Sequence, residues 1–125
     1  MGREPKRKMD EYKYFQVEQH EGAPVLVLID PSKLNFMMMT GLRDELTGFF
    51  LENSPKRLVI DFTQVASCSS VTIASLIDAR NHICEGGGNI TLCGMSEDVR
   101  AVFRVTNLDT LFTICDTVAD ALKAF

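Results

Sequence analysis

Apolar and polar residues along the chain follow two kinds of spacing, one typical of strands and one typical of helices. From Tyr12 the apolar residues first alternate with polar ones, and after a turn at 21–24 they form the unbroken run 25–29. Two such runs joined by a short turn that contains glycine and proline are typical of a β-hairpin. We therefore predict a hairpin over residues 12–29.

The stretch after the hairpin has the spacing of an amphipathic helix. Its apolar positions recur every three or four residues and are Met38, Leu42, Leu46, Phe49 and Phe50. This spacing places them on one face of a helix, which would cover the sheet. The segment 53–55, Asn-Ser-Pro, ends the predicted helix because proline cannot continue it.

Three strand–helix units follow. The predicted strands are 57–62, 89–93 and 111–115, and the first is apolar enough to be a central, parallel strand. The apolar positions of the three predicted helices are Ile73, Leu76, Ile77, Ile83 and Cys84 in the first, Val99, Val102 and Phe103 in the second, and Val118, Ala121, Leu122 and Phe125 in the third. The order ββαβαβαβα predicts an α/β fold in which helices cover a mixed β-sheet.

Polar residues mark where these three helices begin and end. Ser69 or Ser70 suits the start of the first helix, Ser96 the second and Thr117 the third, because their hydroxyl groups cap free backbone N–H groups. The glycine run 86–88 follows a helix and precedes a strand, which is the reverse of a phosphate-binding loop. It therefore predicts a helix C-cap with a tight turn.

The composition is that of an ordinary globular domain. The chain has 125 residues, 46% of them hydrophobic and 24% charged, which is enough for one hydrophobic core without disulfide or metal support. Basic residues cluster in the segment 1–11, which we expect to be a flexible polar tail, and we expect residues 12–125 to form a single domain. The net charge of −4 argues against nucleic acid as the main partner.

The sequence also indicates whether the protein inserts into membranes or is secreted. No apolar run approaches the about 18–20 residues that a membrane-spanning helix requires. The basic N-terminal segment is not followed by a hydrophobic stretch, as a secretory signal would be. We therefore expect a cytoplasmic protein that does not insert into membranes.

Cysteine and histidine spacing argues against metal and nucleophilic chemistry. The sequence has no Cys-x-x-Cys pair, and its cysteines and histidines are Cys68, Cys84, Cys93, Cys115, His20 and His82. The cysteines lie in or beside apolar stretches, where a free thiol packs as a small hydrophobic group, and both histidines have polar neighbours. We expect no cofactor, no metal and no enzyme activity, because no acid, base or nucleophile pair converges on one loop.

Two segments carry more polar or adaptable side chains than folding explains. The segment 66–72 joins a buried strand to a helix start and holds the hydroxyl residues Ser67, Ser69, Ser70 and Thr72. Capping needs only one of them, so the segment is a candidate binding or modification surface.

The segment 34–39 includes Asn35, Phe36, Met37 and Met39. Methionine beside an aromatic residue is common on protein-binding surfaces, and core packing at the start of a helix explains this segment equally well.

The sequence from Leu58 to Leu122 resembles the STAS domain, which is named for sulphate transporters and anti-sigma factor antagonists. The resemblance rests on an ordered set of motifs: strand 58–62 followed by Val65, glycines ahead of strand 90–93, Val-x-x-x-Phe at 99–103, and Leu-Phe at 111–112. With the predicted hairpin it covers residues 12–125. It implies a STAS-like (SpoIIAA-like) α/β fold with the mixed sheet described above.

The resemblance also identifies a departure from the family motif. Family antagonists carry Asp-Ser-Ser/Thr-Gly at the start of this helix, and a partner kinase phosphorylates the third residue. Matched without a gap from the glycine run, the motif falls on 69–72 and the acceptor on Val71, which has no hydroxyl. A family aspartate that helps partner binding falls on Asn35, so two expected negative charges are absent. The substitute acceptors that remain nearby are Ser69, Ser70 and Thr72.

The resemblance implies a non-catalytic regulatory module that binds an anti-sigma factor or a serine kinase-like ATPase. Its partner-binding residues would be Asn35, Phe36, Met37, Met39, Ser67, Ser69, Ser70, Val71 and Thr72. The alternative is an accessory subunit of an ABC-type transporter assembly, which a missing acceptor fits well. A small-molecule sensor would need a pocket near the carboxyl edge of the sheet. The sequence leaves the partner, the upstream signal and the oligomeric state open.

Overall fold

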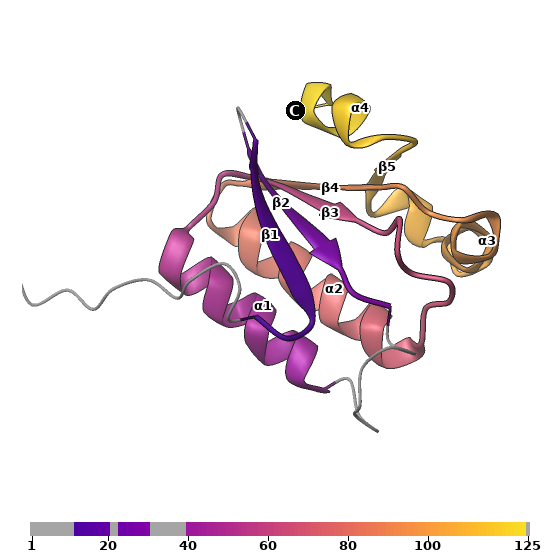
Figure 1. Cartoon of the computed structure of the whole chain (residues 1–125), viewed down its shortest axis with the longest axis horizontal. Coiled ribbons are helices and arrows are strands. Elements are labelled where there is room, and N and C mark those ends of the chain that lie inside the picture. The colour runs from indigo at the N-terminus through magenta and orange to yellow at the C-terminus, as the bar shows by residue number, and fades with distance from the viewer. Residues whose placement is uncertain (1–11, 21–22, 31–39, 125) are drawn as a thin grey trace, which may run out of the picture.

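The computed structural model describes residues 12–20, 23–30 and 40–124 of the chain. Its elements, in chain order, are β1 (Phe15–His20), β2 (Ala23–Leu28), α1 (Thr40–Asn53), β3 (Arg57–Asp61), α2 (Ser70–Glu85), β4 (Asn89–Cys93), α3 (Glu97–Val105), the 3₁₀ turn η3 (Leu108–Thr110), β5 (Thr113–Cys115) and α4 (Val118–Lys123). The predicted order of strands and α-helices is confirmed (Figure 1).

The strands form one five-stranded mixed sheet with the order β1-β2-β3-β4-β5. β1 and β2 pair antiparallel as the predicted hairpin, with Phe15 opposite Leu28 and His20 opposite Ala23. The three remaining pairs are parallel, because a helix crosses over between each strand and the next. The predicted mixed sheet is therefore confirmed.

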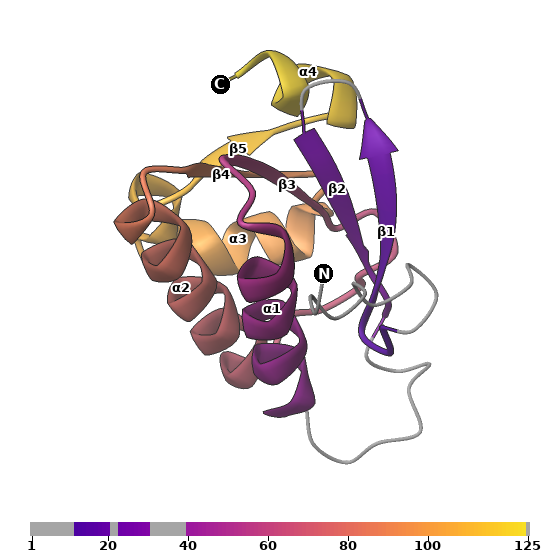
Figure 2. The same ribbon diagram turned by 90° about the vertical axis from the view of Figure 1, so that its left-hand side faces the viewer.

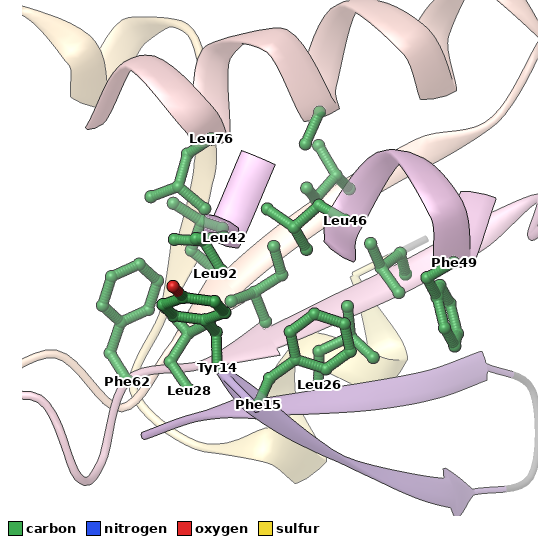
Figure 3. Close-up of a cluster of buried hydrophobic side chains, with 14 of the residues drawn as sticks. Tyr14, Phe15, Leu26, Leu28, Leu42, Leu46, Phe49, Phe62, Leu76 and Leu92 are labelled. Atoms are coloured by element: carbon green, nitrogen blue, oxygen red, sulfur yellow. The ribbon is translucent and has the colours of Figure 1, made fainter. Parts of the chain in front are cut away.

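Helices cover both faces of the sheet. α1 and α2 lie side by side on one face, and α4 lies on the other (Figure 2). The larger core lies under α1 and α2, and Figure 3 shows how the hairpin and the two helices supply it. Its fully buried side chains include Phe15, Leu26, Leu42, Leu46, Ile60, Leu76 and Leu92.

The apolar runs in β2, β3 and β4 reflect burial on both faces. In β3, Leu58 and Ile60 belong to the larger core, whereas Val59 between them packs in a smaller cluster with Ala121 of α4. Successive side chains of a strand point to opposite faces. The sequence of a strand that is covered on both faces is therefore a continuous run of apolar residues, rather than an alternation of apolar and polar residues.

The predicted helix caps are confirmed. The side-chain oxygens of Ser69, Ser96 and Thr117 each accept a hydrogen bond from the backbone N–H three residues later. Of the two serines that suited α2, Ser69 is the N-cap. At the other end, Gly86 is the C-cap of α2, and Gly87 adopts φ +82°, a conformation that favours glycine.

Three details of the sequence prediction need correction. The last strand covers only 113–115, because the N–H groups of Leu111 and Phe112 bind the carbonyl of Leu108 at 3.0 and 3.1 Å and continue the η3 turn instead. Cys84 is exposed, since its neighbour Ile83 occupies the buried position on α2. Val102 is only half-buried, because Val99 and Phe103 already fill the core-facing side of α3.

Some expectations concern parts of the chain that the structure does not describe. Met38, Phe125 and the segment 1–11 lie outside the described residues. Within the described residues, none of the helices has both the length and the hydropathy needed to cross a lipid bilayer.

Candidate functional site

The loop from β3 to α2 makes its turn as soon as the strand leaves the sheet. The buried carboxylate of Asp61 accepts a hydrogen bond from the backbone N–H of Thr63 at 2.9 Å. The N–H of Val65 binds the carbonyl of Phe62 at 2.9 Å, and the Val65 side chain is buried. These contacts fix the path of the loop, and hence the position of the first turn of α2.

Two of the predicted hydroxyl residues hold the helix start together. The Oγ of Ser69 accepts the N–H of Thr72 at 3.2 Å and lies 3.1 Å from the Thr72 Oγ1. Thr72 is 2% exposed, so its hydroxyl lies beneath the surface. Capping therefore occupies Ser69 and Thr72, and leaves Ser67 and Ser70 as the exposed hydroxyl residues of the segment that take no part in the cap.

Val71 presents its side chain to the surface in the first turn of α2. It is 41% exposed, whereas the residues that follow it on the core side, Thr72 and Ser75, are each 2% exposed. The Val71 carbonyl accepts a hydrogen bond from the Ser75 Oγ at 3.0 Å. The helix backbone at Val71 is therefore fixed, while its methyl groups are available for contact.

An open hollow of about 620 Å³ lies between α1 and α2 next to Val71. We call it the α1–α2 hollow, and its lining residues are Arg43 and Asp44 of α1 and Ser70, Val71, Ala74 and Ser75 of α2. At its edge the Arg43 Nε lies 2.6 Å from the Asp78 Oδ2, an ion pair that links the two helices. The hollow thus combines apolar and hydroxyl residues of α2 with charged residues of α1.

Of the two segments predicted to bind a partner, 66–72 and 34–39, the structure describes only the first. It places Ser70 and Val71 together in the hollow. Asn35, Phe36, Met37 and Met39 lie outside the described residues, so their role in binding stays a prediction. Sequence reasoning missed Arg43 and Asp44. The sequence holds part of the signal, because helices that follow neighbouring parallel strands begin at the same edge of the sheet, but it does not show which side chains of the two helices face each other.

Three of the four cysteines, unlike the exposed Cys84, have the character of shielded thiols rather than nucleophiles. Burial raises the pKa of Cys68 to about 11. Burial, followed by the negative charge of Asp61, raises the pKa of Cys93 to about 12. Burial also raises the pKa of Cys115. The thiolate is the reactive form, so these three thiols are poor nucleophiles at neutral pH.

Residues 14–121 match the family model of the STAS domain. The chain belongs to the STAS domain family. A TM1081 homologue from Thermotoga neapolitana, named as an anti-sigma factor antagonist, is 24% identical over 99 residues, which span 79% of this chain and 88% of the relative. The STAS recognition made from the sequence is confirmed.

Solved structures share this STAS fold. The crystal structure of an anti-sigma factor antagonist from Mycobacterium paratuberculosis has a TM-score of 0.74 and 24% identity, and the match covers 88% of this chain and 91% of that one. A sulfate transporter family protein from Wolinella succinogenes has a TM-score of 0.68 and 17% identity over 82% of this chain and 83% of its own. The predicted STAS-like fold is confirmed by these likenesses.

The first turn of α2 can be compared with the phosphorylation motif of the STAS family. By the ungapped match above, the family's phosphorylated tetrapeptide falls on 69–72, where this chain has the cap Ser69, the exposed Ser70 and Val71, and the buried Thr72. The position of the acceptor at Val71 stays a prediction. Within the described residues, His, Cys, Asp and Glu side chains form no group of three or more that could hold a metal ion.

Proposed function

We propose that this STAS domain is a non-catalytic regulatory module that binds a protein of the anti-sigma factor or serine kinase-like ATPase class through the first turn of α2. The exposed Val71 side chain carries the proposal. An apolar side chain beside the small hydroxyl residue Ser70 offers contact area without a charge that must be desolvated. The relatives named as anti-sigma factor antagonists support this class of partner.

The proposed binding is not switched off at Val71. A phosphate adds a charge of about −1.5 to −2 at pH 7, which opposes docking through like-charge repulsion and desolvation. The resemblance puts the family acceptor at Val71, which has no hydroxyl to receive a phosphate. The partner would therefore stay bound unless another residue takes the phosphate or another signal releases it.

Among the substitute acceptors, Ser70 is favoured by its surroundings. Its residue is exposed and lines the α1–α2 hollow. The exposed Ser69 hydroxyl is engaged in capping and Thr72 is buried, so phosphorylation of either residue would disrupt the contacts that hold the helix start. Peptide mapping of protein from its native cells tests this point: phosphate on Ser70 would show a relocated switch and overturn the idea of an unswitched binder.

A second candidate function is an accessory subunit of a transporter assembly of the ABC type. The fold likeness to the sulfate transporter family protein and the missing hydroxyl at Val71 favour it. Affinity capture of the tagged chain from its own cells separates the two. We expect an anti-sigma factor or kinase-like ATPase among the captured proteins. Recovery of transporter ATPase subunits in its place would favour the second function.

A further inference from the structure

The α2 side of the α1–α2 hollow is lined by apolar and small hydroxyl residues. Val71 and Ala74 are exposed and line the hollow, and the exposed Ser70 beside them adds one small hydroxyl group. Ser75 is polar by type, but it is 2% exposed and its Oγ donates to the Val71 carbonyl at 3.0 Å. The exposed side chains of Val71 and Ala74 therefore favour contact with the aliphatic part of an incoming side chain.

The rim of the hollow carries one uncompensated negative charge. Arg43 is paired with Asp78, with the Nε and Oδ2 atoms 2.6 Å apart, so their charges offset one another. Asp44 is exposed beside them, and it makes no ion pair or hydrogen bond with any residue that the structure describes. A carboxylate in the same hollow as exposed apolar side chains is the complement of a cation on an aliphatic stem.

We propose that the α1–α2 hollow receives a basic side chain, arginine above all, from the protein partner; this rests on the proposed function and names the chemistry of the partner. The methylene stem lies across Val71 and Ala74, and the guanidinium binds the Asp44 carboxylate. Long basic side chains bury their stems on apolar surface while the charged head stays near water. Arginine suits the site better than lysine, because its planar guanidinium binds a carboxylate through two parallel hydrogen bonds.

An acidic side chain is the rival occupant, drawn by Arg43 and by the helix start. It would have to displace Asp78 from Arg43, and it would meet the like charge of Asp44. The capping oxygen of Ser69 already accepts the N–H of Thr72, which leaves fewer free N–H groups to attract an anion. The net charge of −4 on the whole chain also favours a basic partner.

Three short peptides test the hollow without the natural partner. Acetyl-Ala-Arg-Ala-amide, its citrulline analogue and its glutamate analogue are each titrated into the ¹⁵N-labelled full chain. We expect saturable amide shifts at Asp44, Val71 and Ala74, with about two- to fivefold tighter binding of the arginine peptide than of the neutral citrulline peptide. Equal binding of these two peptides, tighter binding of the glutamate peptide, or shifts confined to other surfaces would overturn the proposal.

A pair of matched variants tests whether the carboxylate of Asp44 binds the arginine side chain. Asp44→Asn should lower the affinity for the arginine peptide to that of the citrulline peptide, and Asp109→Asn, an exposed aspartate in η3, should leave it unchanged. An unchanged affinity in Asp44→Asn contradicts the proposal. Because both residues are exposed, both variants should fold. The proposed function fails separately, when capture recovers no anti-sigma factor or kinase-like ATPase.

Discussion

At the scale of single residues, Glu45 of α1 joins the helix layer to the start of the sheet. Its carboxylate accepts the backbone N–H of Lys13 at 2.9 and 2.8 Å and the N–H of Tyr14 at 2.9 Å. The carbonyl of Tyr14 in turn accepts the N–H of Ile29 at 3.0 Å. One side chain therefore fixes the chain before β1 against α1, close to the residues that line the hollow.

Removal of this carboxylate should destabilise the fold. Glu45→Ala leaves two backbone N–H groups without a charged acceptor, and hydrogen bonds to charged groups contribute about 1.5–3 kcal/mol, less where the donor is exposed as at Lys13. We expect a loss of about 1–2 kcal/mol in the free energy of unfolding, measured by urea denaturation. Glu85→Ala, at the exposed end of α2, is the control. Equal stability of the two variants would contradict the role of Glu45.

The thiols should react in the order that their exposure and pKa values set. Cys84 is exposed, Cys68 and Cys115 are half-buried, and Cys93 is buried. In the folded protein at neutral pH, a disulfide reagent should therefore label one thiol rapidly, and Cys84→Ser should abolish this fast phase. Raising the pH toward the Cys68 pKa of about 11 should speed the labelling of Cys68, because the thiolate fraction then grows. A fast phase that survives in Cys84→Ser would contradict this order.

At the scale of elements, the pairing of α1 with α2 creates the candidate site. Both helices follow parallel neighbouring strands, β2 and β3, and they lie side by side on one face of the sheet. Their first turns therefore share one end of the molecule, and Arg43 in the first turn of α1 forms an ion pair with Asp78, which lies two turns farther along α2. The position of the first turn of α2 depends in addition on the cap residue Ser69.

The assignment of Ser69 as the N-cap of α2 can be tested by comparing the stability of variants at two adjacent serines. Ser69→Ala removes the acceptor for the N–H of Thr72, and loss of an N-cap costs about 1 kcal/mol of stability. Ser70→Ala removes an exposed hydroxyl within the helix and should leave the stability nearly unchanged. Thermal unfolding of the two variants gives the comparison. If Ser70→Ala is the more destabilised of the pair, the assignment of Ser69 as the cap is wrong.

At the scale of the whole molecule, most of the fold follows from local signals in the sequence. The strand 89–93 and the helix caps at Ser96 and Thr117 have the predicted positions, because periodicity and capping are local properties. Leu111 and Phe112 also have strand-like composition. A backbone turn to Leu108 takes their N–H groups instead, and this competition depends on the geometry of the η3 turn rather than on residue type.

The candidate site is less accessible to sequence reasoning than the fold. The sequence predicts Ser70 and Val71 as site residues because they lie in one short segment. Arg43 and Asp44 belong to a helix about 30 residues earlier, and only the packing of α1 on α2 brings them to the same hollow. The burial of Thr72 depends likewise on which side of α2 faces the sheet. A surface formed by two helices can be identified only when the structure shows how the helices pack against each other.

Affinity capture with three matched forms of the chain tests the central claim most directly. Wild type, Val71→Asp and Val105→Asp are each tagged and captured from the native cells, and the recovered proteins are quantified by mass spectrometry. Val105 is a control of the same residue type, 84% exposed on α3. Because both valines are exposed, the two variants should melt within a few degrees of wild type. We predict that an anti-sigma factor or kinase-like ATPase is recovered with wild type and Val105→Asp and is lost with Val71→Asp. Undiminished recovery with Val71→Asp would contradict the account.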